Sequence, residues 1–102
     1  MIDDARALEG AGADIVLLEC VPTSLGTAIR DALHVPVIGI GAGPGVDGQI
    51  LVLYDILGIT QGRMPRFVQN FMRGRDEPLE ALRAYVHAVK TRAYPASEHT
   101  FS

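Results

Sequence analysis

The stretch Ile15–Pro22 reads IVLLECVP, and it decides the class of fold. Its first four residues form an uninterrupted apolar run, which is typical of a strand buried on both faces of a parallel sheet. The run ends on a carboxylate, Glu19. Because side chains alternate along a strand, Ile15, Leu17 and Glu19 are expected to share one face.

Helical and strand patterns alternate on either side of this stretch. Apolar residues recur at spacings of three and four over 24–33, which predicts a helix, and the apolar run over 35–40 predicts a second buried strand. Residues 50–54 favour a third strand, although they would also suit a helix. The other expected elements are helices over 3–10, 64–72 and 77–93 and an extended tail over 96–102.

The order of these elements predicts an α/β fold with a parallel sheet, because strands linked by helices form crossover units. A complete (β/α)₈ TIM barrel needs about 250 residues, and this chain has 102. Three buried parallel strands cannot close a barrel or cover both faces of their own sheet. We therefore interpret residues 1–102 as one part of a single barrel domain.

The composition argues against several classes of function. Nine basic and twelve acidic residues give a net charge of −3, and no basic cluster indicates a nucleic-acid or membrane partner. Cys20 is the only cysteine, so the chain has no internal disulfide and no cysteine-rich zinc site. No apolar run approaches the roughly 20 residues of a membrane span, and residues 1–4 do not resemble a signal peptide. These features predict a cytoplasmic protein.

Glu19 is the main candidate for chemistry. It lies at the carboxyl end of a predicted strand, where parallel α/β folds place their sites. A carboxylate at a partly desolvated barrel mouth suits the role of general base. The structural alternative, that Glu19 extends into solvent or pairs with an arginine, stays open at this point. Cys20 points to the opposite face and fits a small buried hydrophobe better than a nucleophile.

The glycine-rich loop over 41–45 is a second candidate, because its backbone N–H groups could surround an anionic oxygen. The loop does not match the dinucleotide-binding fingerprint, since its glycines stand at every second position and Pro44 lacks an N–H donor. Within the preceding strand, Gly39 fits a packing role, because small residues make room where barrel side chains crowd.

Other polar residues have structural interpretations of comparable weight. Asp47 precedes a glycine and fits a turn. Asp55 could make a polar contact in a site, cap a helix, or form a salt bridge to Arg63 or Arg66. No metal-ligand spacing connects the three histidines, which are His34, His87 and His99.

Several motifs are spread along the chain in a defined order. They are ALEGAGA at 7–13, LLECVP at 17–22, PVIGIGAG at 36–43 and DGQILV at 47–52, with PRF at 65–67, NF at 70–71, YP at 94–95 and EHTF at 98–101. Together they resemble the ketopantoate hydroxymethyltransferase family and cover essentially the whole chain. The resemblance implies that residues 1–102 are the C-terminal portion of a single TIM-barrel domain, about strands six to eight with their helices, and that the N-terminal strands are absent.

The resemblance also implies an activity. The family transfers a hydroxymethyl group from 5,10-methylenetetrahydrofolate to 3-methyl-2-oxobutanoate, which gives ketopantoate for pantothenate and coenzyme A synthesis. Glu19 is then the proton acceptor, and Mg²⁺ chelates the keto acid. The family's ligands for Mg²⁺ and the keto acid lie in its earlier strands, and no residue here matches them, so the isolated chain is expected to be inactive. A homo-oligomer is also expected, a decamer in the family, with helix 77–93 as a candidate contact.

Two other functions stay open. A phosphate-binding TIM-barrel isomerase or synthase would use the loop over 41–45 and would need no base at Glu19. A truncated, non-catalytic chain would instead self-associate through strand edges that it cannot cover.

Overall fold

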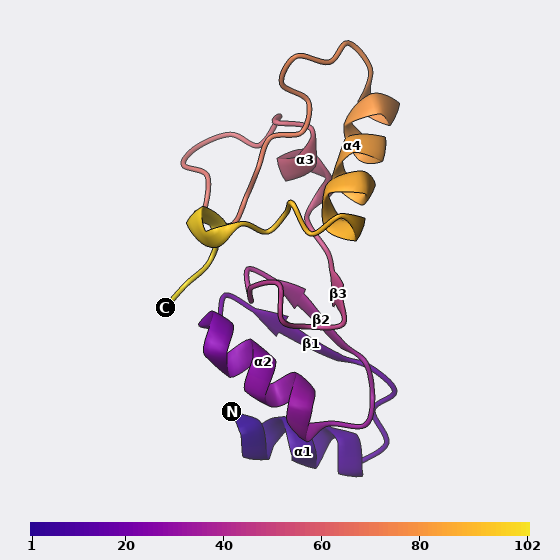
Figure 1. Ribbon diagram of the computed structural model, residues 1–102, viewed down its shortest axis with the longest axis vertical. Coiled ribbons are helices and arrows are strands. Elements are labelled where there is room, and N and C mark those ends of the chain that lie inside the picture. Colours follow the sequence, from indigo (N-terminus) through magenta and orange to yellow (C-terminus); the bar gives the residue numbers. More distant parts are fainter.

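A computed structural model describes all residues, 1–102, and contains two lobes stacked along an axis of 45 Å (Figure 1). We call residues 1–50 the sheet lobe, residues 51–95 the helical lobe and residues 96–102 the tail. The elements, in chain order, are α1 (Ile2–Gly10), β1 (Val16–Glu19), α2 (Thr23–Ala32), β2 (Val37–Ile40), β3 (Gly48–Gln49), α3 (Leu53–Ile56), α4 (Pro78–Lys90) and the 3₁₀ helix η1 (Ser97–His99).

The sheet lobe is a parallel α/β unit, as the sequence predicts. Its three strands lie in the order β1-β2-β3 and all pairs are parallel. Val16 pairs with Val37 and Glu19 pairs with Ile40, so β1 and β2 end at the same edge of the sheet. Helix α2 makes the crossover between them and, with α1, lies beside the strands (Figure 1).

Only one face of β1 is covered in this chain. Val16 and Leu18 are buried in a core with side chains of α1, α2 and the loop after β2. On the other face, Ile15 is 59% exposed and Leu17 is 55% exposed. The predicted alternation of side chains is thus confirmed, whereas the expected burial of both faces is not found within these residues.

The third strand occupies different residues from those predicted. It comprises Gly48–Gln49, and the apolar run over 50–54 follows it into the short helix α3. Asp47 fixes this register, because its N–H donates to the Val37 carbonyl (2.9 Å) and its carboxylate accepts the Val37 N–H (2.8 Å). The prediction of a strand over 50–54 is therefore wrong: β3 pairs beside β2 before the apolar run begins.

The predicted helix over 64–72 is also absent, and turns and irregular chain take its place. Its large side chains are buried by separate partners rather than along one helical stripe. The Phe67 carbonyl accepts the Tyr94 hydroxyl, and the Phe71 N–H donates to the Ile56 carbonyl at 2.9 Å. These contacts satisfy backbone groups that a helix would otherwise pair internally.

Helix α4 is confirmed, although it spans Pro78–Lys90 rather than 77–93. Pro78 lies in its first turn, where its missing N–H costs nothing. The chain leaves the helix before Arg92, which has a left-handed φ of 63°. The tail is not simply extended, since it forms η1 and buries His99 against the Tyr94 ring, with centroids 4.9 Å apart.

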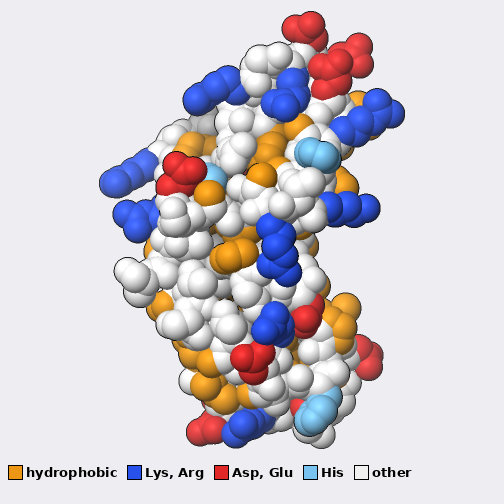
Figure 2. All heavy atoms as spheres, in the orientation of Figure 1, with side chains coloured by type: hydrophobic (Ala, Val, Ile, Leu, Met, Phe, Trp, Pro, Cys, Tyr) orange, Lys and Arg blue, Asp and Glu red, His pale blue; other side chains and the backbone are white.

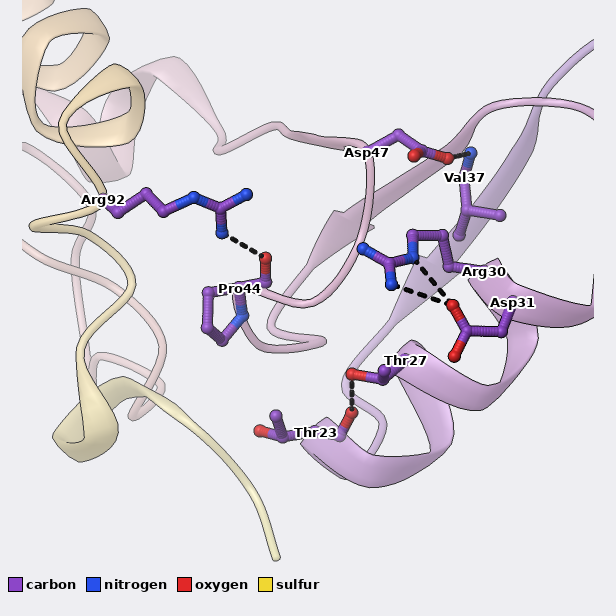
Figure 3. Close-up of polar contacts among 8 residues, drawn as sticks. All are labelled: Thr23, Thr27, Arg30, Asp31, Val37, Pro44, Asp47 and Arg92. Atoms are coloured by element: carbon purple, nitrogen blue, oxygen red, sulfur yellow. Dashed lines mark hydrogen bonds and ion pairs between the residues drawn. The ribbon is translucent and has the colours of Figure 1, made fainter.

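Each lobe has its own core. The sheet-lobe core consists of Ala5, Val16, Leu18, Val21, Ile29, Val37, Ala42 and Val46. The helical-lobe core consists of Ile56, Phe71, Ala81 and Tyr94, with further side chains of α4 packed against it. Arg92 connects the lobes by donating from Nη1 to the Pro44 carbonyl at 3.3 Å (Figure 3). No helix in this structure has the length and apolar character needed to cross a membrane.

Candidate functional site at the strand ends

The candidate site is a cleft of about 510 Å³ at the carboxyl end of β1. Glu19 is the last residue of β1 and is exposed in the cleft wall. The segment 63–67 of the helical lobe and Phe101 of the tail complete the lining. The cleft therefore combines residues that are far apart in the sequence.

Glu19 makes no ion pair and no side-chain hydrogen bond in this structure, whose salt bridges join Met1 to Asp4, Arg30 to Asp31 and Glu9 to His34. Of the two structural alternatives, pairing with an arginine is not observed, whereas the exposure of Glu19 to solvent is observed. The carboxylate is open to solvent and free to accept a proton from a bound molecule.

Cys20 lies next to Glu19 but differs from the prediction. It is exposed rather than buried, and its φ of 54° is unusual for a residue other than glycine. The Cys20 N–H donates to the Ile40 carbonyl at 2.9 Å, which fixes this conformation at the strand end. Partial desolvation, together with the negative charge of Glu19, raises the pKa of the Cys20 thiol. The thiol is protonated near neutral pH and is not an activated nucleophile.

The glycines near the end of β2 allow close packing beside the site. A Cβ at Gly39 would lie 3.0 Å from Val46 and 3.1 Å from Ala42, which confirms the predicted packing role. Gly41 has a φ of +66°, and a Cβ there would lie 2.7 Å from the Phe67 ring. Phe67 can therefore pack directly on the backbone at the end of β2, next to the cleft.

The rest of the glycine-rich loop is held by its own chain. The Gly43 carbonyl accepts a hydrogen bond from Gln49 Nε2 at 2.8 Å. The next carbonyl, that of Pro44, accepts the bond from Arg92, which Figure 3 shows reaching across from the helical lobe. Arg92 is therefore directed at a carbonyl oxygen of this loop, and its guanidinium supports the connection between the lobes.

The two aspartates considered from the sequence have structural roles. Asp47 accepts the Val37 N–H (Figure 3), so its role is structural, although it pairs beside β2 instead of forming the turn that the Asp-Gly pair predicts. Asp55 is buried in α3, and its carboxylate accepts the hydroxyl of Thr60. No salt bridge joins Asp55 to Arg63 or Arg66, the two partners considered from the sequence.

The histidines lie at three separate places. His34 is exposed and pairs with Glu9, with Nδ1 and Oε1 3.2 Å apart. His99 is buried, and its Nδ1 accepts the Ala96 N–H at 3.0 Å. His87 is exposed on α4. No three His, Cys, Asp or Glu side chains come close enough together to hold a metal ion.

Sequence reasoning did not identify four of the residues that line the cleft, namely Arg63, Arg66, Phe67 and Phe101. Assigning 64–72 to a helix obscured Arg66 and Phe67, because that assignment removes the segment from the strand ends. The glycine and proline at positions 62 and 65 are a loop signal that favours the observed conformation. No sequence pattern indicates that the tail returns to the same place.

The fold and the cleft define a parallel α/β protein with its candidate site at the carboxyl ends of the strands, the usual position in such enzymes. A family model described as ketopantoate hydroxymethyltransferase matches residues 1–97. The chain belongs to this family.

Curated relatives are named 3-methyl-2-oxobutanoate hydroxymethyltransferase. That of Chromohalobacter salexigens is 63% identical over 101 residues, which cover 99% of this chain and 38% of the relative. That of Alkalilimnicola ehrlichii is 60% identical over 99% of the chain and 36% of the relative. A relative from Hahella chejuensis, whose name carries the number 2, is 55% identical over the whole chain and 39% of its own length. The chain thus spans less than two fifths of these relatives.

Proposed function

We propose that this chain is the C-terminal portion of a TIM-barrel hydroxymethyltransferase, with about strands six to eight of the barrel. The assembled enzyme would transfer a hydroxymethyl group from 5,10-methylenetetrahydrofolate to 3-methyl-2-oxobutanoate. The relatives' names support the reaction, and the 36% to 39% coverage of their length supports the assignment to part of a larger protein. The uncovered face of β1, with Ile15 and Leu17 exposed, fits a barrel interior that other strands would complete.

The observation that carries the proposed mechanism is the position of Glu19. Its unpaired carboxylate lies at the strand end, in the wall of the cleft. In this role Glu19 removes a proton from the carbon beside the ketone of 3-methyl-2-oxobutanoate, which gives an enolate. Water adds to the methylene carbon of the donor and both of its C–N bonds break, which releases tetrahydrofolate and leaves the carbon at the oxidation level of formaldehyde. The enolate carbon then bonds to this carbon, and the new alkoxide takes up a proton, so the oxygen of the hydroxymethyl group comes from water. The resemblance implies that the ligands for Mg²⁺ belong to earlier strands of the barrel, outside this chain, and no cluster of three donor side chains is found here.

The test joins this chain to the N-terminal portion of the Chromohalobacter salexigens relative at the aligned position. We expect the joined enzyme to transfer the hydroxymethyl group and Glu19→Gln to lower turnover at saturating substrate by about 100-fold or more, the range for loss of a general base. The matched control is Glu98→Gln, which changes an exposed carboxylate outside the cleft.

A second measurement isolates the proton transfer. Without the folate donor, the joined enzyme should exchange the proton beside the ketone for deuterium in D₂O, which NMR follows directly. Glu19→Gln should slow this exchange to a similar extent. Full turnover and full exchange by the Gln variant would show that another group removes the proton.

A further inference from the structure

The cleft at Glu19 has an excess of positive charge that the proton transfer does not explain. Two arginines, Arg63 and Arg66, line it together with the single carboxylate. Neither arginine forms a salt bridge or a side-chain hydrogen bond, and both are exposed. Two guanidinium groups are therefore available for an anionic ligand beside the proposed base.

The charges of the two lobes reinforce this local excess. The helical lobe has seven basic and four acidic residues and a net charge of +3, whereas the sheet lobe has two basic and seven acidic residues and a net charge of −5. Figure 2 shows the basic side chains concentrated on the helical lobe and around the waist of the molecule. An anion approaching the cleft therefore meets a positive lobe next to the arginines.

The segment that contains the arginines is fixed on its C-terminal side, next to Arg66. Phe67 directly follows Arg66, and its ring packs on the Gly41 backbone while its carbonyl accepts the Tyr94 hydroxyl. The Val68 N–H also donates to the Pro65 carbonyl at 3.1 Å. These contacts hold the backbone on either side of Arg66, so less conformational freedom is lost at that residue when a ligand binds.

We propose that Arg63 and Arg66 bind a carboxylate of the one-carbon donor. This inference rests on the proposed function and deepens it, because both reactants of that reaction bear carboxylates. Guanidinium groups recognise carboxylates through paired N–H···O bonds. The donor is favoured over the keto acid for two reasons. Its glutamyl carboxylates lie far from its reacting carbon, so they can bind to arginines while that carbon reacts elsewhere. The cleft of about 510 Å³ is also within the range of about 300–1,000 Å³ for pockets that bind ligands much larger than the keto acid.

The aromatic rings of the cleft support the same ligand. Phe67 and Phe101 lie on the lining together with the two arginines. Phe67 is 6% exposed and packs on Gly41, whereas Phe101 is half-buried and can offer a ring face to the aromatic benzoyl ring of a folate. The cationic groups suit the glutamyl end of the folate. The keto acid has no aromatic part that could use these side chains.

The variants Arg63→Gln and Arg66→Gln, singly and together, test the inference in the joined enzyme. Removal of both charges should raise the KM for 5,10-methylenetetrahydrofolate by about tenfold or more, the usual scale for loss of a charged hydrogen bond. The KM for 3-methyl-2-oxobutanoate and the kcat should stay within about twofold. Arg73→Gln is the matched control, since Arg73 is exposed on the same lobe but lies outside the cleft.

Donors that differ only in their glutamyl part separate the two carboxylate sources. A donor without the glutamate should bind the unsubstituted enzyme as weakly as the double variant binds the complete donor, and the double variant should not distinguish the two donors. A selective rise in the KM for the keto acid would assign the arginines to that substrate and overturn the inference. Equal effects of the double variant and Arg73→Gln would overturn it as well.

Equilibrium binding makes the outcome independent of turnover. Binding of tetrahydrofolate to the joined protein, followed by calorimetry, should weaken by about tenfold or more in the double variant. Unchanged binding overturns the role of the arginines even if the enzyme is active. Loss of hydroxymethyl transfer with arginine-dependent folate binding intact would instead place the failure in the proposed reaction.

Discussion

Replacing Gly41 with alanine would destabilise the protein in two separate ways. Its φ of +66° is unfavourable for other residues, and a Cβ would also lie 2.7 Å from the Phe67 ring. Gly74 has a similar φ of +77° but nothing within 4 Å of its would-be Cβ. The two positions therefore separate backbone strain from steric contact with a cleft residue.

We expect Gly41→Ala to lower the free energy of unfolding by at least about 1 kcal/mol more than Gly74→Ala, because only the first substitution displaces a packed ring. Urea denaturation of both variants measures the difference. Equal losses would mean that Phe67 moves away without cost and that its contact with Gly41 does not hold the cleft segment.

Glu9 provides a second prediction for single residues, in this case for pH dependence. Its carboxylate at the end of α1 accepts the N–H groups of His34 and Val35, at 2.5 and 3.0 Å. The bonds from the His34 backbone and side chain hold the pKa of the Glu9 carboxyl below its ordinary value. The folded protein favours the charged form of Glu9. This contribution to stability is therefore fully present above the pKa of an unfolded glutamate, about 4.3. It is lost as the pH falls through the lower pKa that Glu9 has in the folded protein.

The Glu9→Gln variant should therefore show a weaker loss of stability between neutral pH and acid than the unsubstituted chain. Urea midpoints measured from pH 7 down to pH of about 3 test this expectation. Glu80→Gln is the control, because Glu80 is exposed and has no side-chain partner. If both variants lose stability in parallel with the parent chain, the bond from Glu9 to the α2–β2 loop contributes nothing in solution.

Glu19 and Cys20 show what single residues reveal before a structure is known. A carboxylate directly after an apolar run marks a strand end, so the position of Glu19 could be predicted from the local sequence. The exposure of Cys20 could not, because it depends on a left-handed backbone conformation that only the neighbouring strand fixes. The cleft arginines depend on contacts between distant segments, which no local pattern contains.

At the scale of elements, a cluster of aromatic rings joins α4 to the segment before it. Phe71, Tyr85 and Tyr94 meet edge to face, with centroids 5.4 to 6.1 Å apart. The two tyrosine hydroxyls differ: that of Tyr94 donates to the Phe67 carbonyl, and that of Tyr85 is buried with no partner. Burial is the main cause of the raised pKa of both phenols, so both remain neutral through the physiological range.

These two hydroxyls form a matched pair of substitutions. We expect Tyr94→Phe to lower the free energy of unfolding by about 1–3 kcal/mol, because it leaves a carbonyl without its donor. Tyr85→Phe should leave stability unchanged or raise it by up to about 1 kcal/mol, because it removes an unpaired buried polar group. Thermal and urea unfolding would measure both, and a larger loss in Tyr85→Phe would contradict the hydrogen-bond assignment.

The predicted elements that failed have a common physical cause. Residues 50–54 and 64–72 are apolar enough to suit a strand or a helix, and their local sequence fits either. Their actual conformations are decided by distant partners: Asp47 starts β3 early by pairing with Val37, and Tyr94 holds Phe67 in irregular chain. By contrast, α2 and α4 have apolar residues at regular helical spacing, and both could be predicted.

At the scale of the whole molecule, the uncovered face of β1 determines how the chain should behave alone. Ile15 and Leu17 lie on this face, next to an open strand edge, and such surfaces associate in water. We expect the isolated chain to self-associate and the double substitution Ile15→Thr and Leu17→Thr to reduce that association. Light scattering coupled to size exclusion measures the change, and Ile59→Thr serves as a control at another exposed apolar site.

The same double substitution, which should improve the behaviour of the isolated chain, should instead destabilise the joined enzyme. There the two side chains are proposed to fill the barrel interior, so polar replacements should destabilise it by about 2 kcal/mol or more. Equal stability of the joined enzyme with and without the substitutions would show that this face is not part of a barrel core. A homo-oligomer of the assembled enzyme also remains a prediction, which the same light-scattering measurement addresses.

The contact between the tail and α2 has a practical consequence for all of these experiments. The Phe101 carbonyl accepts the N–H of Thr23, a donor in the first turn of α2 that has no partner within the helix. An affinity tag or surface linker fused directly after residue 102 would disturb this hydrogen bond and the position of Phe101 in the cleft lining. Purification handles and immobilisation chemistry are therefore better placed at the other end of the protein.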